Sequence, residues 1–560
     1  MRWYGLLLMA LWVVVGGWWA EAGEVERRDR YLIDLELDYG GGRFTGRQSF
    51  HWTNRLDAAV EVLEFNLYPN VGQELESETA VGALEVEEVK AEGHQVKWSL
   101  RSKRTLVRVE FERRIEVGER VEVRFRFRGR VPRVQREETS LLAHFMQEVN
   151  DALEEERVPA DARDIFFAGE EALLICYFHP LLVVRPSALD GVGFPMGLGR
   201  LVLAGMADYE VSVAITGGTE RSGDLQVISS GRPARTSTRE GRTGQYRFVG
   251  EARRGFALAI GEKLRAEERR VGRASVVSWY REGDQREGRR VLEIVAAALA
   301  IYRESFGEYP YDHLQVVEFP IAAGYSAVDL PGMIVLPQAY YVDLDAARLS
   351  GVIREQADVV RASFEFNIAR AVAGQWWGRV VGVDCERTPF VAEALNGYAA
   401  IRYHDRRYGA ALGDSITRQY VRGAYQAYRI LGGTDKEAEQ PARTFESSLQ
   451  YAAIVQAKGT LLMLAIREAI GEEQTLSILR ELYRRSAGET LSGENLRQAF
   501  LSGAGESKPI RIAFQRWLRE KRGDEDIGSP ELSQVPAPVS KIRSLGRIFL
   551  KIGRKAARPF

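Results

Sequence analysis

Histidine and cysteine are both scarce in this chain. Its 560 residues include six histidines and two cysteines. No two histidines lie four residues apart, so the sequence lacks the pair that binds zinc from one helical face. No complete G-x-S-x-G elbow is present either, and no cysteine–histidine pair forms a convincing nucleophile motif. The histidines are His51, His94, His144, His179, His313 and His404.

The shortage of cysteine excludes a disulfide-stabilised fold. Two cysteines cannot form a disulfide framework for a chain of 560 residues, although an oxidising compartment would permit one bridge. Cys176 lies in the apolar run 172–177, which favours a buried thiol. We therefore expect Cys176 and Cys385 to be buried and unpaired.

Net charge is also lacking. The formal charge is -1, with 45% hydrophobic and 28% charged residues. This composition is typical of a folded globular protein and gives no global field that would attract nucleic acid. The length exceeds that of one ordinary domain, so we expect several units.

The N-terminus is apolar. An apolar run from Gly5 to Ala20 follows Met1-Arg2-Trp3-Tyr4, and Ala20-Glu21-Ala22 resembles a signal-peptidase site. We predict a secretory signal over residues 1–22, with an uncleaved N-terminal anchor as the alternative. Both place the rest of the chain outside the cytoplasm, as a secreted or periplasmic protein.

The periodicity of the sequence predicts a multidomain α+β protein. Strict alternation in 31–39 and 121–127 is typical of half-buried strands, and similar strands recur to about residue 260. We expect an N-terminal antiparallel β domain over 23–266. Helical periodicity begins near 285 and surrounds a small sheet, which places a mainly α domain at 270–525. The expected helices are 291–302, 352–380, 392–408 and 457–470, and the expected strands of the small sheet include 313–319 and 333–336.

The C-terminus is basic. Residues 526–540 carry proline, serine and glycine and read as a linker, and 541–560 contain seven basic residues and no acidic one. Ile542, Leu545, Phe549 and Ile552 fall near helical spacing, as in an amphipathic helix on an anionic membrane surface. A frayed, solvated tail remains the alternative.

Four segments in the second half carry a resemblance to a known family. Residues 30–525 resemble the aminopeptidase N-like gluzincins, zinc metallopeptidases with an N-terminal β domain and a thermolysin-like domain. Single motifs are weak, but four in the family's order, with the same domain layout, favour this fold. The segments are Glu308-Tyr309-Pro310-Tyr311, Ala327-Val328-Asp329-Leu330-Pro331-Gly332, Gln375-Trp376-Trp377-Gly378 with Glu393, and Tyr451-Ala452-Ala453-Ile454-Val455-Gln456-Ala457-Lys458-Gly459.

The resemblance places the family's zinc motif on residues 370–374. The two histidine ligands are then replaced by Arg370 and Gly374, and the general base by Ala371. Only the third ligand, Glu393, is retained, and 18 residues separate it from Gly374. One carboxylate cannot hold a catalytic zinc ion, which needs three protein ligands, and a guanidinium does not coordinate metal. We therefore expect no zinc, although the resemblance implies it for the family.

Two further family positions are altered. The tyrosine that would stabilise the oxyanion is Gln456, and the glutamate that would bind the substrate's amine is Asp329. Asp329 keeps the charge with a shorter reach, although it could equally be a turn residue. Gln375, Trp376 and Trp377 are better explained by packing than by substrate contact.

Loss of a divalent cation would leave Glu393 unpaired. An unpaired buried charge costs several kcal/mol, roughly, after relaxation. Our hypothesis is that the Arg370 guanidinium occupies part of the zinc space and pairs with Glu393. The alternative is that Arg370 points out of a degenerate pocket into solvent.

These observations predict a non-catalytic homologue of a zinc aminopeptidase. A preserved cleft could bind a peptide or a protein terminus, with Asp329, Glu393, Arg370 and Gln456 as candidate cleft residues. One alternative is a membrane-associated structural or assembly protein that uses its basic tail. The other is an active metallo-aminopeptidase with an atypical metal site.

Overall fold

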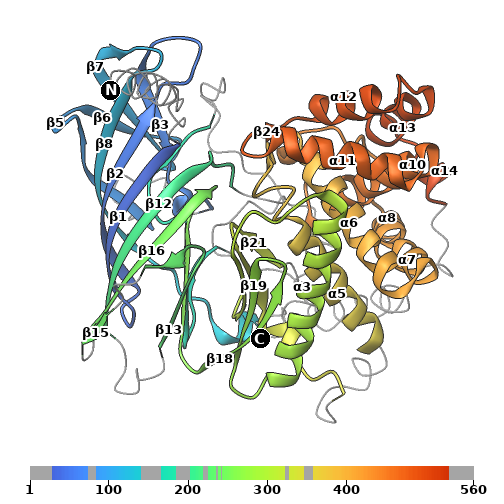
Figure 1. Ribbon diagram of the computed structural model, residues 1–560, viewed down its shortest axis with the longest axis horizontal. Coiled ribbons are helices and arrows are strands. Elements are labelled where there is room, and N and C mark those ends of the chain that lie inside the picture. Colours follow the sequence, from blue (N-terminus) through green and yellow to red (C-terminus); the bar gives the residue numbers. More distant parts are fainter. Residues whose placement is uncertain are drawn as a thin grey trace, which may run out of the picture.

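The computed structural model describes residues 28–72, 83–139, 165–184, 202–217, 225–234, 238–240, 243–321, 327–345 and 357–528. The predicted signal at 1–22, the part of the predicted linker 526–540 that follows residue 528, and the basic tail 541–560 lie outside these residues. A β-rich part and a helical part lie side by side, with a smaller sheet between them (Figure 1). This is the predicted order of domains.

The β-rich part is built on a nine-stranded sheet with the order β14-β16-β12-β1-β2-β8-β4-β5, in which β15 pairs with β16. In β1 and β8, buried residues alternate with exposed or half-buried ones, as the period-2 pattern predicts. The sheet is mostly antiparallel, but β1 and β12 run parallel, which the local pattern does not encode. The strands are Asp29–Asp38 (β1), Arg43–Thr53 (β2), Leu84–Ala91 (β4), His94–Gln95 (β5), Arg120–Arg130 (β8), Ala207–Thr216 (β12), Arg232–Pro233 (β14), Thr238–Glu240 (β15) and Thr243–Arg253 (β16).

Two four-stranded sheets complete the β-rich part, with the orders β11-β3-β7-β6 and β13-β17-β10-β9. Cys176 ends β10 and is buried, and Cys385 of the second part is buried as well; neither forms a disulfide, as expected. The strands are Val60–Asn66 (β3), Lys97–Arg101 (β6), Leu106–Ile115 (β7), Phe166–Ala168 (β9), Ala172–Cys176 (β10), Leu181–Leu182 (β11), Gln226–Ser229 (β13) and Ala257–Gly261 (β17).

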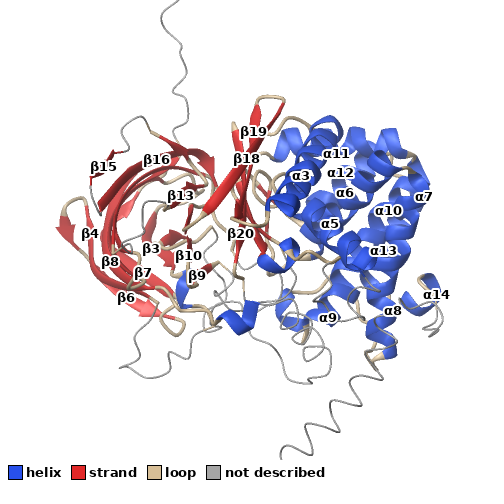
Figure 2. Cartoon of the chain, turned by 90° about the horizontal axis from the view of Figure 1, so that it is seen from below, coloured by secondary structure: helices blue, strands red, loops and turns tan. Residues whose placement is uncertain are grey.

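A five-stranded sheet, β18-β19-β20-β22-β21, stands between the two parts, as Figures 1 and 2 both show. Its strands β20 and β22 are buried on both faces. Leu314, Val316, Ile334 and Leu336 belong to the core of the helical part, whereas the alternating Val317, Phe319, Met333 and Val335 belong to the core of the β-rich part. The predicted boundary at 266–270 falls within its first strand. The strands are Leu264–Val271 (β18), Ala274–Arg281 (β19), His313–Phe319 (β20), Val328–Leu330 (β21) and Met333–Pro337 (β22).

Helices cover the far side of this sheet (Figure 2). The helix expected over 352–380 ends earlier, because Gly374 begins a turn and Gly378 has a φ of 151° that a helix cannot accommodate. A short pairing of Gly382–Val383 (β23) with Thr490–Leu491 (β24) follows. The helices are Gln285–Phe306 (α3), Ala357–Ala373 (α5), Phe390–Tyr408 (α6), Ala410–Ile416 (α7), Gly423–Ile430 (α8), Ser448–Tyr451 (α9), Lys458–Ile470 (α10), Glu472–Ser486 (α11), Gly493–Gly503 (α12), Lys508–Arg519 (α13) and Gly523–Asp526 (α14).

Short turns of other helical types connect these elements. Ser448–Ile470 forms one continuous helical stretch, long and apolar enough by composition to span a membrane. Of the most apolar 18 residues of this stretch, 72% are buried inside the structure, as is typical of a core helix. The 3₁₀ segments are Tyr68–Asn70 (η1), Arg136–Thr139 (η2), Gln338–Tyr341 (η5) and Ala442–Thr444 (η7), and the π-helical segments are Thr417–Arg422 (η6) and Ala452–Ala457 (η8).

Candidate functional site

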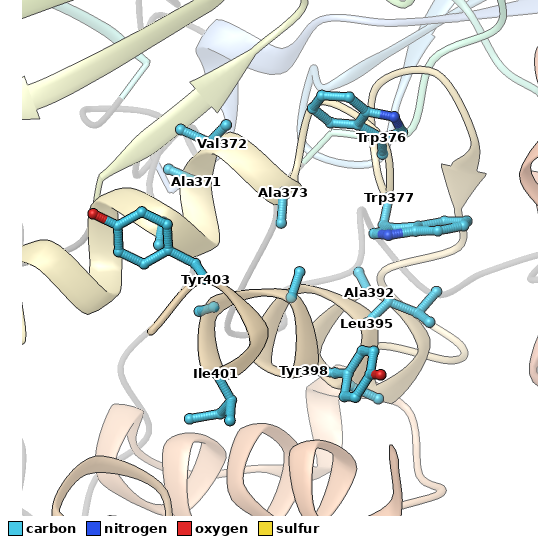
Figure 3. Close-up of a cluster of buried hydrophobic side chains, with 14 of the residues drawn as sticks. Ala371, Val372, Ala373, Trp376, Trp377, Ala392, Leu395, Tyr398, Ile401 and Tyr403 are labelled. Atoms are coloured by element: carbon cyan, nitrogen blue, oxygen red, sulfur yellow. The ribbon is translucent and has the colours of Figure 1, made fainter. Parts of the chain in front are cut away.

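Two packed helices, α5 and α6, carry the residues that the resemblance places at a zinc motif. Buried side chains fill the space between them and the turn after α5 (Figure 3). Trp376 donates from Nε1 to the carbonyl of Gly307 at 3.0 Å and lies edge-on to Tyr302 at 5.9 Å. Trp377 lies edge-on to Phe306 at 5.5 Å. Both tryptophans are therefore core residues, which agrees with the expectation that they serve packing rather than substrate contact.

The side chain of Gln375 forms hydrogen bonds with the backbone of the segment that follows Asp329. Its side chain is fully buried and accepts from the backbone N–H of Gly332 at 3.0 Å while donating to the carbonyl of Leu330 at 2.9 Å. One amide thereby satisfies both a donor and an acceptor of the segment that follows Asp329. Gln375 fixes this segment against the end of α5.

Arg370 and Glu393 form an ion pair between α5 and α6. Nη2 of Arg370 donates to Oε2 of Glu393, and Nη1 donates to Oε1 of Gln456 at 3.3 Å. Oε1 of Glu393 accepts from the hydroxyl of Tyr451 at 3.4 Å. The Glu393 side chain is 7% exposed and that of Arg370 is 20% exposed. The expected ion pair is present, and Arg370 does not point into open solvent.

This pairing joins three segments that are distant in sequence. Arg370 lies in the last turn of α5, Glu393 in the first turn of α6 and Gln456 in the π-helical segment η8. A carboxylate near a helix N-terminus is favoured by the helix dipole, as is a cation near a C-terminus. Each charge is therefore stabilised by the dipole of its own helix in addition to the ion pair.

Asp329 is also paired with an arginine. Nε of Arg379 donates to Oδ2 of Asp329 at 3.0 Å, and its Nη1 donates to the hydroxyl of Tyr177 at 3.1 Å. Both charged side chains are less than a tenth exposed. Burial alone would lower the pKa of Arg379, but Tyr177, Asp329 and Cys385 outweigh it and raise the pKa. Asp329 is therefore held in an ion pair rather than presented to a ligand amine.

Arg379 is a residue of this site that the sequence pattern does not indicate. It directly follows Gly378, the last residue of the quoted motif. Its position gives no sign that it pairs with Asp329, 50 residues earlier, because the contact is tertiary. A search for charged residues near the motif would include Arg379 as one possible partner of a carboxylate, but it would not identify Asp329 as that carboxylate.

The residues at the zinc positions do not fit the donor set of a catalytic zinc ion. Gly374 offers no side chain, Arg370 offers a guanidinium that cannot coordinate, and Glu393 already accepts from Arg370 and Tyr451. Within the described ranges, no three histidine, cysteine, aspartate or glutamate side chains are grouped closely enough to hold a metal ion. Ala371, which the resemblance places at the general base, is a buried apolar residue.

The fold is similar to that of solved zinc metallopeptidases. An M1 zinc metallopeptidase from Deinococcus radiodurans matches 88% of this chain and 94% of its own, with 14% identity and a TM-score of 0.56. A two-domain M1 zinc metallopeptidase mutant bound to L-arginine gives 15% identity, the same coverage and a TM-score of 0.56. No protein-family model and no curated protein matches the chain. At this identity the similarity establishes the fold: the chain has the two-domain fold of the M1 zinc metallopeptidases.

Proposed function

We propose that this protein is a non-catalytic homologue of the M1 zinc aminopeptidases that binds a peptide or a protein partner outside the cytoplasm. The observation that supports this most directly is the ion pair of Arg370 with Glu393, which uses the one retained ligand. The proposal joins this contact to the peptidase-like fold.

The chemistry of peptide hydrolysis needs groups that are missing at these positions. A metallopeptidase polarises the scissile carbonyl and activates water with its metal, and a nearby carboxylate accepts the proton. Ala371 can accept no proton, and the amide of Gln456 is engaged by Arg370. An atypical metal site would need ligands outside residues 370–393.

The electrostatics also bear on the ligand. Asp329 and Glu393 were the anionic groups expected to attract an amine, and both are neutralised by arginines. An amino terminus would have to displace an internal guanidinium to reach either carboxylate. We therefore propose that binding depends on contacts with the rest of the ligand rather than on recognition of its amine.

Metal analysis and an activity assay test the proposal together. The purified chain is expected to contain zinc well below one atom per molecule and to leave aminoacyl chromogenic substrates intact. Stoichiometric zinc together with hydrolysis would refute the proposal. Peptide binding is tested separately by thermal unfolding with a diverse peptide set, where a bound ligand raises the unfolding temperature.

A reversion variant tests the frame of the site. Arg370→His, Ala371→Glu and Gly374→His together place an HExxH sequence before Gln375, with Glu393 as third ligand. This variant is expected to bind about one zinc ion per molecule, measured by metal analysis after dialysis. The same variant with Glu393→Gln serves as the matched control and is expected to retain far less zinc.

The membrane-associated alternative depends on residues 541–560, which lie outside the described ranges. Deletion of these residues, followed by measurement of liposome association, separates it from binding in the folded part. Unchanged association after the deletion would exclude a role of the tail.

A further inference from the structure

Two consecutive arginines stand at the end of strand β16: Arg253 is its last residue and Arg254 follows it. Arg254 donates from Nη1 to the carbonyl of Ala204 at 2.8 Å and from Nη2 to the carbonyls of Gly488 and Glu489, the latter at 2.7 Å. In the side chain of Arg253, Nε and Nη1 are buried without a hydrogen-bond partner among the described residues. Nε of Arg254 is buried and without a partner as well.

Both guanidinium groups lie against glycines outside the β-rich part. A Cβ on Gly332 would lie 2.2 Å from Nη1 of Arg253, and one on Gly382 would lie 2.6 Å from Cζ of Arg254. Arg253 also stacks on Tyr311, with Cζ 3.5 Å from the ring centroid. Stacking stabilises the cation, but it leaves the N–H groups without acceptors.

A third arginine adds to the positive charge. Arg379 lies close enough for its charge to act on both Arg254 and Tyr311. Burial lowers the pKa of Arg254 to about 10, and the charge of Arg379 opposes protonation further. Arg253, Arg254 and Arg379 are 3%, 3% and 7% exposed, whereas the buried carboxylate beside them is that of Asp329. The acidic groups Asp312, which interacts with Arg253, and Glu489, which interacts with Arg254, are exposed.

Three buried guanidinium groups with one buried carboxylate leave an excess of positive charge in a region of low dielectric. Burial of an uncompensated charge is unfavourable, and each unsatisfied N–H adds to this cost. Guanidinium groups bind carboxylates and inorganic oxyanions with charge-assisted hydrogen bonds. An acceptor with negative charge at Arg253 would remove both costs.

We propose that the junction between the two parts is an anion-binding site, formed by Arg253 and Arg254 beside Arg379. The ligand is a small anion, either an inorganic ion or a carboxylate group of an organic ligand. This site is separate from the pair of Arg370 and Glu393 and does not depend on the proposed lack of catalysis. Because its residues come from both parts, a bound anion would hold the two parts together.

Thermal unfolding of the full chain tests this site with sodium chloride, sodium phosphate and sodium acetate. For a ligand that binds only the folded chain, the unfolding temperature is expected to rise by about 1–3 °C for each tenfold increase in anion above its dissociation constant. Arg253→Gln is expected to lose this rise. Arg269→Gln is the matched control, because Arg269 is exposed on β18 and forms no ion pair with a described residue.

The three anions distinguish the sources. A rise with acetate alone supports a carboxylate ligand, and a rise with chloride or phosphate supports an inorganic ion. Equal responses of Arg253→Gln and Arg269→Gln to all three salts would overturn the proposal. If Arg253→Gln fails to fold, crystals of the unaltered chain soaked in sodium bromide and in sodium bromoacetate decide: an anomalous peak within hydrogen-bond distance of Arg253 or Arg254 in either soak supports the site, and its absence from both overturns it.

Discussion

Arg370 links α5, α6 and η8 through its contacts with Glu393 and Gln456. Removal of one partner of a buried pair leaves the other charge uncompensated. We expect Arg370→Met to destabilise the protein by about 3 kcal/mol, because Glu393 then stays buried without a cation. Urea unfolding measures this change.

Two variants control this prediction. Arg480→Met removes an exposed arginine that pairs with no described carboxylate and is expected to change stability by less than about 0.5 kcal/mol. The double variant Arg370→Met with Glu393→Met is expected to recover most of the loss, since an apolar pair can replace an ionic one. A double variant no more stable than Arg370→Met would show that the charge of Glu393 is not the cause.

Glu318 gives the protein a pH-dependent stability. It is buried on β20, and burial raises its pKa to about 8, with a further rise from the neighbouring Asp284. Between pH 4.5 and 8 the folded state keeps a proton that the unfolded state has lost. This group's contribution therefore falls as pH rises through that window, by up to about 1.4 kcal/mol per pH unit.

The measurement compares urea unfolding of the wild type and Glu318→Gln at several pH values. Glu318→Gln is expected to gain stability relative to the wild type as pH rises from 5 to 8. Glu304→Gln is the control, because the Glu304 side chain is 71% exposed. Parallel pH profiles for the wild type and Glu318→Gln would contradict the prediction.

How far the sequence predicts these contacts depends on the residue. The pair of Arg370 and Glu393 was predictable, because a family frame placed both groups around one site and charge neutrality required a partner. The pair of Asp329 and Arg379 was not, because no frame relates the two positions and only the folded chain brings them together. Arg253 and Arg254 gave no signal either, since their burial depends on the approach of a second part of the molecule.

At the scale of elements, α6 and α10 pack closely at a glycine. A Cβ on Gly397 would lie 1.9 Å from Oγ1 of Thr460. Gly397→Ala is expected to destabilise the protein by about 1–3 kcal/mol, because the two helices must move apart or Thr460 must shift. Thermal unfolding measures the loss.

Thr460→Ala provides the test of mechanism for that change. It removes the hydroxyl that an alanine at 397 would strike, although Cβ of Thr460 would still lie 3.0 Å from the new methyl group. Thr460→Ala added to Gly397→Ala is therefore expected to restore part of the stability. Strictly additive losses would show that the clash is not with Thr460.

Element positions were predictable where the pattern was strong. The strand at 313–319 and the helices at 392–408 and 457–470 appear within two residues of their expected bounds, because apolar residues recur with the proper period. The helix expected to extend to residue 380 ends at Ala373, because the backbone turns at the glycines that follow. The prediction was too long because the apolar Trp376 and Trp377 continue the helical pattern. The composition of a segment alone does not distinguish a helix that continues from one that ends in a turn.

At the scale of the whole molecule, the five-stranded sheet belongs to two hydrophobic cores. Its β20 strand directs Leu314 and Val316 to the helical part and Val317 and Phe319 to the β-rich part. The sequence shows only a run of apolar residues here, which predicts a strand buried on both faces but not what covers each face. Such a shared sheet couples the stability of the two parts.

This coupling predicts that the full chain unfolds in one calorimetric transition. Phe319 lies edge-on to Phe167 of β9, with the ring centroids 6.4 Å apart, so it joins the two parts directly. Phe319→Ala is expected to cost about 3–5 kcal/mol and to split the transition in two, because the loss falls on the junction. Phe500→Ala removes a ring of equal size from the interior of the helical part and is expected to lower the midpoint without a split. Two resolved transitions in the unaltered chain would contradict the coupling, and a single transition in Phe319→Ala would show that other contacts, such as those of Arg254, are enough to maintain it.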